Sequence, residues 1–159
     1  RWQARDRVRF GAELSRETRG FNRPEGRVLR TNVAGARGEY APSASTRVTL
    51  EAARTVLPSF LAGEMNRQTL MRAGLGQRIV GRIHLNATLL RRNQDYVPAN
   101  SAAPVARSDH SRTLDLAVSC GLLRRLNLSL LHRTTRNTSS LAGHAFRSRQ
   151  VGAELGARF

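Results

Sequence analysis

Residues 113–122 read TLDLAVSCGL, and every second residue of this stretch is apolar. The apolar set comprises Leu114, Leu116, Val118, Cys120 and Leu122. The alternate set comprises Thr113, Asp115, Ala117, Ser119 and Gly121. Successive side chains of a β-strand point to opposite faces, so this period of two residues is typical of a strand with one apolar and one wet face. The stretch therefore predicts a β-strand of about ten residues.

The flanking sequence repeats this alternation on both sides. Residues 126–134, LNLSLLHRT, place Leu126, Leu128 and Leu130 on one face. Residues 82–91, RIHLNATLLR, place Ile83, Leu85, Ala87 and Leu89 on one face. The pattern is fainter towards the amino terminus and weakest at 27–38. Eight strands are predicted, at residues 5–18, 27–39, 46–57, 66–77, 82–93, 111–122, 126–137 and 146–159.

Residues 51–75 also contain many helix-forming residues. A helix over 51–57 or over 64–73 is therefore the competing interpretation of this part of the chain. Pro58 and Gly63 would interrupt one long helix there, so strands remain the favoured prediction.

The predicted connections alternate in length along the chain. Short connections are predicted at 40–45, 78–81 and 123–125, and longer ones at 19–26, 58–65, 94–110 and 138–145. All five prolines fall in these connections, as expected of residues that cannot donate to a sheet ladder. Short turns at one end of the strands and longer loops at the other are typical of outer-membrane barrels.

The sequence thus predicts an all-β protein, a single domain over 1–159 built as an antiparallel up-and-down meander of about eight strands. An outer-membrane β-barrel, or the C-terminal portion of one, is favoured because the strands exceed the roughly 5–6 residues usual in soluble sheets. A soluble sandwich is the alternative. The chain begins with Arg1, so a longer protein is expected. An eight-stranded barrel is filled by its own side chains, so transport would require further strands.

The charge balance is the second notable feature of the sequence. The chain has 27 arginines, no lysine and 11 acidic residues, which gives a formal net charge of +16. This balance favours a polyanionic partner, although a GC-rich genome would also place arginine where others place lysine. No segment approaches the roughly 18 apolar residues of a membrane-spanning helix, whereas a barrel strand needs only about 9–11 residues. Cys120 is the single cysteine, so an internal disulfide is excluded.

The last thirteen residues, RSRQVGAELGARF at 147–159, end on an aromatic residue preceded by apolar residues at alternate positions. This arrangement resembles the C-terminal signature of bacterial outer-membrane β-barrels, which the barrel-assembly machinery reads. The resemblance implies an assembly signal made of Phe159, Ala157, Leu155, Ala153 and Val151.

Further motifs follow in a defined order from about residue 34 to the end, among them LLRRNQDY at 89–96 and RSDHSRTLDL at 107–116. Their order and spacing resemble an outer-membrane β-barrel family associated with exopolysaccharide biosynthesis and export operons. The matching positions are Asp95, Tyr96, Arg107, Asp109, Arg133, Arg136, Asn137 and Ser139. The sequence departs from the family at His132, where tyrosine is expected, and at Leu131, where a polar residue is expected.

This resemblance implies a non-enzymatic protein of the bacterial outer membrane, with a signal peptide upstream of the present chain. The implied function is export or surface anchoring of an anionic exopolysaccharide. The expected partners are outer-membrane lipid, lipopolysaccharide and the barrel-assembly machinery, and no cofactor is expected.

The arginines are the residues from which a binding function is predicted. If the polar strand faces line a lumen, inward-pointing arginines would favour anions such as an acidic polysaccharide. These candidates are Arg9, Arg47, Arg82, Arg92, Arg133 and Arg158. The competing interpretation is that they pair with acidic residues on neighbouring strands. Arg54, Arg91 and Arg149 are expected on the outward face, where they would extend towards lipid headgroups.

No other kind of site is predicted. The four histidines show no metal-ligand spacing, and no nucleophile, base or metal constellation indicates an enzyme. The alternative function is that of a soluble basic β-domain that binds nucleic acid. Nucleic acid is nevertheless not expected as a partner, because stacking aromatics, a recognition helix and a lysine-rich patch are missing. Dependence on detergent would separate the two functions.

Overall fold

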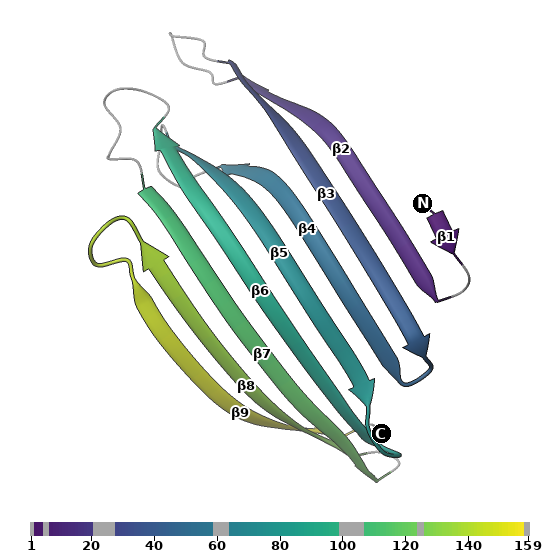
Figure 1. Ribbon diagram of the computed structural model, residues 1–159. Helices are drawn as coiled ribbons and strands as arrows, with labels where there is room; N and C mark the ends of the chain where they lie inside the picture. Colours follow the sequence, from purple (N-terminus) through teal and green to yellow (C-terminus); the bar gives the residue numbers. More distant parts are fainter. Residues whose placement is uncertain are drawn as a thin grey trace.

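The computed structural model describes residues 2–4, 7–20, 28–58, 64–98, 107–123 and 126–157. These residues form one antiparallel sheet of nine strands, eight of them long (Figure 1). The strands are β1 (Trp2–Ala4), β2 (Val8–Gly20), β3 (Val28–Ser43), β4 (Thr46–Pro58), β5 (Glu64–Arg78), β6 (Ile83–Pro98), β7 (Arg107–Leu123), β8 (Leu126–Ser139) and β9 (Phe146–Ala157).

The order of the strands in the sheet is their order in the chain. Each strand pairs antiparallel with the next, from β1 with β2 to β8 with β9. This arrangement confirms the predicted all-β up-and-down meander. The sheet is open, because β1 and β2 lie at one edge and β9 lies at the other (Figure 1).

The strand boundaries differ from the prediction mainly at β6 and β7. The expected loop at 94–110 shortens to 99–106, which lies outside the described residues, because β6 runs on to Pro98 and β7 begins at Arg107. Residues 93–96 pair with 107–110 although both faces are polar there, so no alternation marked them as strand. The short β1 was not predicted. The helical alternative for 51–57 and 64–73 is wrong, because these residues lie in β4 and β5.

Three prolines lie inside strands rather than in the predicted connections. Pro58 and Pro98 are the last residues of β4 and β6. Pro42 lies where the register between β3 and β4 shifts, between Tyr40 and Ser43. Proline is tolerated at strand ends and irregularities because the missing N–H costs no regular ladder hydrogen bond there.

One end of the sheet, called here the tight-turn end, carries the β3–β4 and β5–β6 connections together with the end of β7 and the start of β8 (Figure 1, lower right). In the β5–β6 turn, Ile79 N–H donates to the carbonyl of Ile83 at 3.0 Å, and Ile83 N–H donates to the carbonyl of Val80 at 2.9 Å. Gly81 closes this turn with a φ of 51°, a conformation that costs glycine little and other residues more. The predicted short connection at 78–81 is therefore confirmed.

Strand alternation and register divide the sheet into an apolar face and a polar face. The apolar face carries exposed large hydrophobic side chains on strands β2 to β9. They are Phe10, Leu14, Tyr40, Leu50, Met71, Leu75, Leu89, Leu114, Leu116, Val118, Leu122, Leu130, Val151 and Leu155. In the described part of the chain, Val56 is the one buried hydrophobic side chain. Within the described ranges the sheet is thus a single layer, with no second layer packed against its apolar face.

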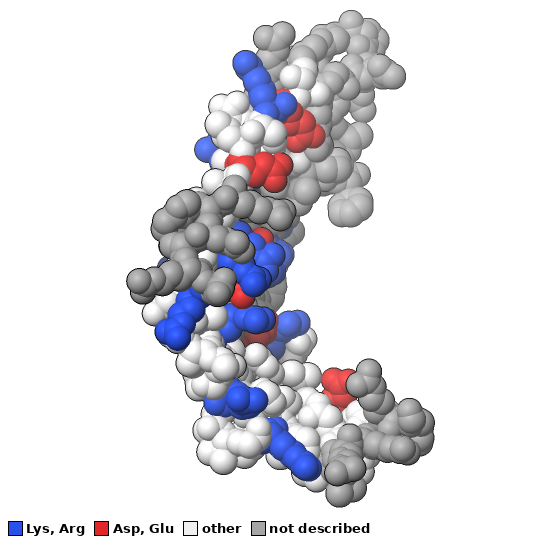
Figure 2. Space-filling model, turned by 90° about the vertical axis from the view of Figure 1, so that its right-hand side faces the viewer, with Lys and Arg blue, Asp and Glu red and all other residues white. Residues whose placement is uncertain are grey.

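Along β7 the polar face is the more sheltered of the two. Thr113, Asp115 and Ala117 are half-buried there, whereas Leu114 and Leu116 between them are exposed. The molecule is bowed in profile, and basic side chains are distributed along its length with fewer acidic ones among them (Figure 2). Large side chains of the apolar face therefore meet the surroundings, the reverse of the usual soluble pattern, and along β7 the polar side chains are partly covered.

Candidate functional site

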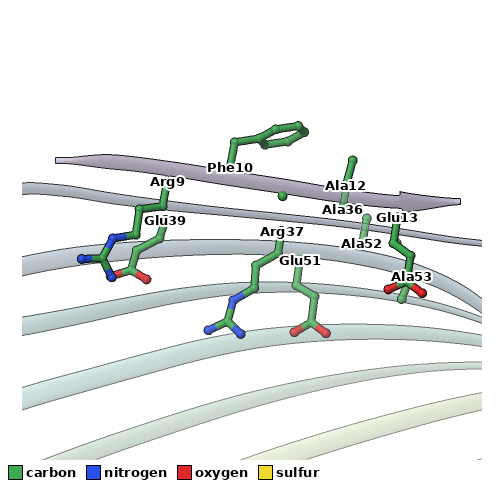
Figure 3. Close-up of a pocket in the computed structure, with 12 residues that line it drawn as sticks. Arg9, Phe10, Ala12, Glu13, Ala36, Arg37, Glu39, Glu51, Ala52 and Ala53 are labelled. Atoms are coloured by element: carbon green, nitrogen blue, oxygen red, sulfur yellow. The ribbon is translucent and has the colours of Figure 1, made fainter. Parts of the chain in front are cut away.

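Charged residues of the polar face oppose one another on β2, β3 and β4. Arg9 is the register partner of Glu39, and Arg47 reaches the same carboxylate with 3.0 Å between Arg47 Nε and Glu39 Oε1. In Figure 3, Arg9 and Glu39 project from one side of the sheet and Phe10 from the other. Cations and carboxylates thus alternate across neighbouring strands of this face.

The next row of the polar face repeats this arrangement. Arg37 on β3 is the register partner of Glu51 on β4, and Glu51 is the partner of Arg72 on β5. The distance between Arg72 Nη1 and Glu51 Oε2 is 3.4 Å. One carboxylate thus lies between two guanidinium groups, which leaves this row with a net positive charge.

An open hollow of about 950 Å³ lies over β2, β3 and β4 (Figure 3). Its charged lining residues are Arg9, Arg37, Glu13, Glu39 and Glu51. Two cations and three carboxylates give a mixed lining, so this part of the polar face does not by itself select anions.

A second hollow, of about 430 Å³, lies over β6 to β9. Its lining includes Asp115 and Arg133, which form a bidentate ion pair. Arg133 Nε donates to Asp115 Oδ1 at 2.5 Å, and Arg133 Nη2 donates to Asp115 Oδ2 at 3.2 Å. The planar guanidinium fits a carboxylate in this geometry, which fixes the Arg133 side chain across two strands.

The six arginines predicted to line a lumen differ in their surroundings. Arg47 and Arg133 are paired with carboxylates, as the competing interpretation expected. Arg82 lies in the β5–β6 turn, where its side chain passes over Gly121. Arg92 lies on the polar face, and its Nε is buried without a hydrogen-bond partner. Arg9 also lies on the polar face, and Arg158 lies outside the described residues.

Five of the family-like residues come together at the loop end of β6, β7 and β8. Arg107 Nε donates to both carboxylate oxygens of Asp109, at 3.0 Å and 2.9 Å, and Arg107 Nη2 also donates to Asp109 Oδ2. The guanidinium carbon of Arg107 lies 4.6 Å from the ring centroid of Tyr96, within range of a cation–π contact. Ser139 on β8 is the register partner of Asp109.

Asp109 supplies the carboxylate of this cluster and is buried, with 4% of its surface exposed. Burial alone would raise its pKa, but hydrogen bonds from Arg107 and Ser139 and the nearby guanidinium charge outweigh burial and lower the pKa. Asn137, also buried, donates through Nδ2 to the carbonyl of His144 at 2.8 Å. These contacts join β6, β7, β8 and the β8–β9 connection, which indicates a structural role.

Two other family-like residues, Asp95 and Arg136, lie on the opposite face. Asp95 Oδ1 accepts a hydrogen bond from Ser108 Oγ at 2.6 Å, and both residues lie on the apolar side of the strand alternation. Arg136 lies on that side too, opposite Arg112. The predicted motif is therefore divided between the two faces of the sheet and is not one site.

The sequence prediction missed a row of arginines on the apolar face. Arg91, Arg112, Arg136 and Arg147 are successive register partners across β6, β7, β8 and β9. Arg91 was expected on this face, but alternation within a strand does not give the alignment between strands. Counting residues from the ends of the strands at the tight-turn end would have revealed it, because each of these arginines lies eight to eleven positions from that end of its strand.

The predicted assembly signal is only partly described. Val151, Ala153, Leu155 and Ala157 are exposed and alternate along β9. Phe159 lies outside the described residues. Recognition of this segment by the assembly machinery stays a prediction.

Among the described residues, no three histidine, cysteine or acidic side chains are grouped closely enough to hold a metal ion. No helix in the described ranges is long and apolar enough to cross a membrane. Comparison of the chain with protein-family models, curated proteins and solved structures finds no significant match.

Proposed function

We propose that this chain forms the wall, or part of the wall, of an outer-membrane β-barrel. Its apolar face would lie against lipid and its polar face would line the interior. The observation that carries the proposal is the exposure of large hydrophobic side chains on one face of a single-layered sheet. Leu14 is 80% exposed and Val151 is 78% exposed. Apolar surface left in water costs about 25 cal/mol per Å², and contact with lipid would remove that cost over the whole face.

The interior of such a barrel would be polar and mixed in charge. The ion pairs between Glu39 and Arg47, and between Asp115 and Arg133, would cross-link neighbouring strands without being exposed to lipid. This distribution supports the barrel, because lipid-facing and interior-facing residues alternate along every strand of a membrane barrel.

We further propose that the polar face contacts an anionic exopolysaccharide during export or surface anchoring. The family resemblance in the sequence supports this function. Arg92 supports it as well, because it is half-buried on the polar face and its Nε has no hydrogen-bond partner. A carboxylate ligand at the outer edge of this guanidinium group would supply charge-assisted hydrogen bonds.

Adjacent leucines on opposite faces provide a test of the barrel. Leu130 on the apolar face is 54% exposed, and Leu131 on the polar face is 45% exposed. Folding into vesicles of outer-membrane lipid is measured for Leu130→Arg and for Leu131→Arg. The first substitution should destabilise the folded form by about 2–4 kcal/mol, and the second by less than about 1 kcal/mol.

Equal losses in the two variants would contradict the assignment of the faces. A chain that folds in buffer without micelles or vesicles, and then binds nucleic acid in a salt-sensitive way, would contradict the outer-membrane proposal altogether.

The ligand is tested separately, on the chain folded in vesicles. We expect a polyuronate to bind with a measurable affinity and neutral dextran not to bind, and we expect Arg92→Gln to weaken polyuronate binding by about tenfold. Arg78→Gln removes one exposed cation at the tight-turn end of β5 and serves as the charge-matched control. Equal binding of both polymers, or equal losses in both variants, would refute the polysaccharide contact.

A further inference from the structure

The apolar face carries its arginines at one level. Seven of the eight long strands have such an arginine eight to eleven positions from their tight-turn ends. The count is eight from Val8 to Arg16, for example, and eleven from Leu123 to Arg112. The set, called here the arginine belt, is Arg16, Arg54, Arg67, Arg91, Arg112, Arg136, Arg147 and Arg149. On β3 the corresponding residue of this face is Asn32.

The distance from the tight-turn end to the belt matches a membrane. A rise of about 3.4 Å per residue makes eight to eleven residues about 27–37 Å along the strand. A strand tilt of about 40° reduces this length to a height of about 21–29 Å, and the apolar band of outer-membrane barrels is about 25 Å tall. On the proposed orientation, the belt therefore lies at the outer boundary of the hydrocarbon layer.

The segment of the apolar face between belt and turns has no acidic or arginine side chain in the described strands. On β6, for example, this segment carries Ile83, Leu85, Ala87 and Leu89. The described arginines of this face therefore begin at one level, immediately beyond this uncharged segment.

One acidic residue lies at the belt, because Asp95 is the register partner of Arg67. None of its guanidinium groups forms an ion pair with a described carboxylate, in contrast to Arg47, Arg72 and Arg133 on the polar face. Arg112 directly opposes Arg91 on one side and Arg136 on the other. Like charges directly opposite in a sheet are destabilising, so this row requires an anion to offset the repulsion.

We infer that the arginine belt binds phosphate groups of a phosphorylated lipid headgroup, such as those of lipopolysaccharide, while the acyl chains lie on the apolar band beside it. This inference rests on the proposed outer-membrane function and names the lipid that the apolar face selects. We specify a lipid rather than free phosphate because the belt adjoins exposed apolar surface. An amphiphile carries a phosphate group for the belt and acyl chains for that apolar surface. Guanidinium groups bind phosphate oxygens in a bidentate geometry, which gives the site its preference for phosphate.

The test uses the full chain folded first in vesicles of neutral zwitterionic lipid. Binding of bisphosphorylated lipid A is then compared with binding of its fully dephosphorylated form, and inorganic phosphate and a DNA oligonucleotide are tested in parallel. We expect Arg112→Gln with Arg136→Gln to weaken phosphorylated lipid A binding by about thirtyfold and to leave the dephosphorylated form unaffected. The control, Arg7→Gln with Arg78→Gln, removes the same charge at the tight-turn end and should retain the preference.

The outcomes separate this inference from the barrel itself. Failure to fold in neutral vesicles would contradict the proposed function. Normal folding with equal affinity for both lipid forms would overturn only the belt. The belt inference would also be overturned if inorganic phosphate or DNA bound as tightly as lipid A and depended on the same two arginines. It would be overturned as well if the control variant lost as much affinity for lipid A as the belt variant.

Discussion

At the scale of single residues, Asp109 shows how a polar residue is accommodated in this sheet. Its carboxylate is buried at the loop end of β7, beyond the arginine belt and therefore outside the segment assigned to the membrane. Arg107 holds it through three hydrogen bonds, and Tyr96 lies against the guanidinium group of Arg107. Burying the carboxylate is tolerated because its charge and its lone pairs are satisfied.

Asp109 should also make stability depend on pH. Folding lowers its pKa, so its contribution is complete above the ordinary value of 3.8 and is lost as the pH falls through the lower folded value. We expect Asp109→Asn to destabilise the folded chain by about 1–3 kcal/mol at pH 7, with the difference from the unaltered chain shrinking below the ordinary pKa.

Urea unfolding at pH 7 and at pH 3 measures this effect. Asp95→Asn is the control, because Asp95 is exposed and accepts one hydrogen bond, from Ser108. A difference between Asp109→Asn and the unaltered chain that stays constant over this pH range would contradict the assignment.

The face of each described candidate arginine that lies within a strand was predictable from the sequence. Arg9, Arg47 and Arg133 lie on the polar face, and Arg54 and Arg91 on the apolar face, as expected. This success has a local cause, because side-chain direction in a strand depends only on whether the number of intervening residues is odd or even. The partner of each side chain depends on register and was not predictable in the same way.

At the scale of the strands, alternation located every long element but not its ends. β3 (Val28–Ser43) has a weak pattern and was predicted largely because its neighbours require a strand between them. Between residues 34 and 40 its apolar face is made of alanine, glycine and a single tyrosine rather than large aliphatic residues. Small side chains carry little hydrophobic contrast, so periodicity is faint even where the backbone pairing is regular. The loop ends of β6 and β7 were missed for the related reason that both of their faces are polar there.

Register between strands creates the features that a single strand lacks. The Arg91–Arg112–Arg136–Arg147 row exists because four consecutive strands align one arginine each. The ion pair between Asp115 and Arg133 arises in the same way, since the two residues are direct register partners. Both arrangements depend on connection lengths and strand pairing together. Composition alone therefore predicted a polyanionic partner but not where on the sheet it would bind.

At the scale of the whole molecule, the sheet has a wet side and an apolar side but no core of its own. A soluble domain buries its apolar faces between two layers, whereas only one layer is present in the described residues. The apolar band, the arginine belt beside it and the paired charges on the opposite face together match the environments across and along the wall of a membrane barrel. We therefore regard lipid as the missing layer.

The most direct test of this account is a cysteine scan of β7 in lipid vesicles. Cys120 is first replaced by serine, and residues 114–119 are then changed to cysteine one at a time and labelled with an environment-sensitive fluorophore. We predict that quenchers attached to lipid chains quench labels at Leu114→Cys, Leu116→Cys and Val118→Cys, and that a water-soluble quencher acts on the alternate positions 115, 117 and 119. Quenching by lipid at all six positions or at none, or with the two sets exchanged, would contradict the account.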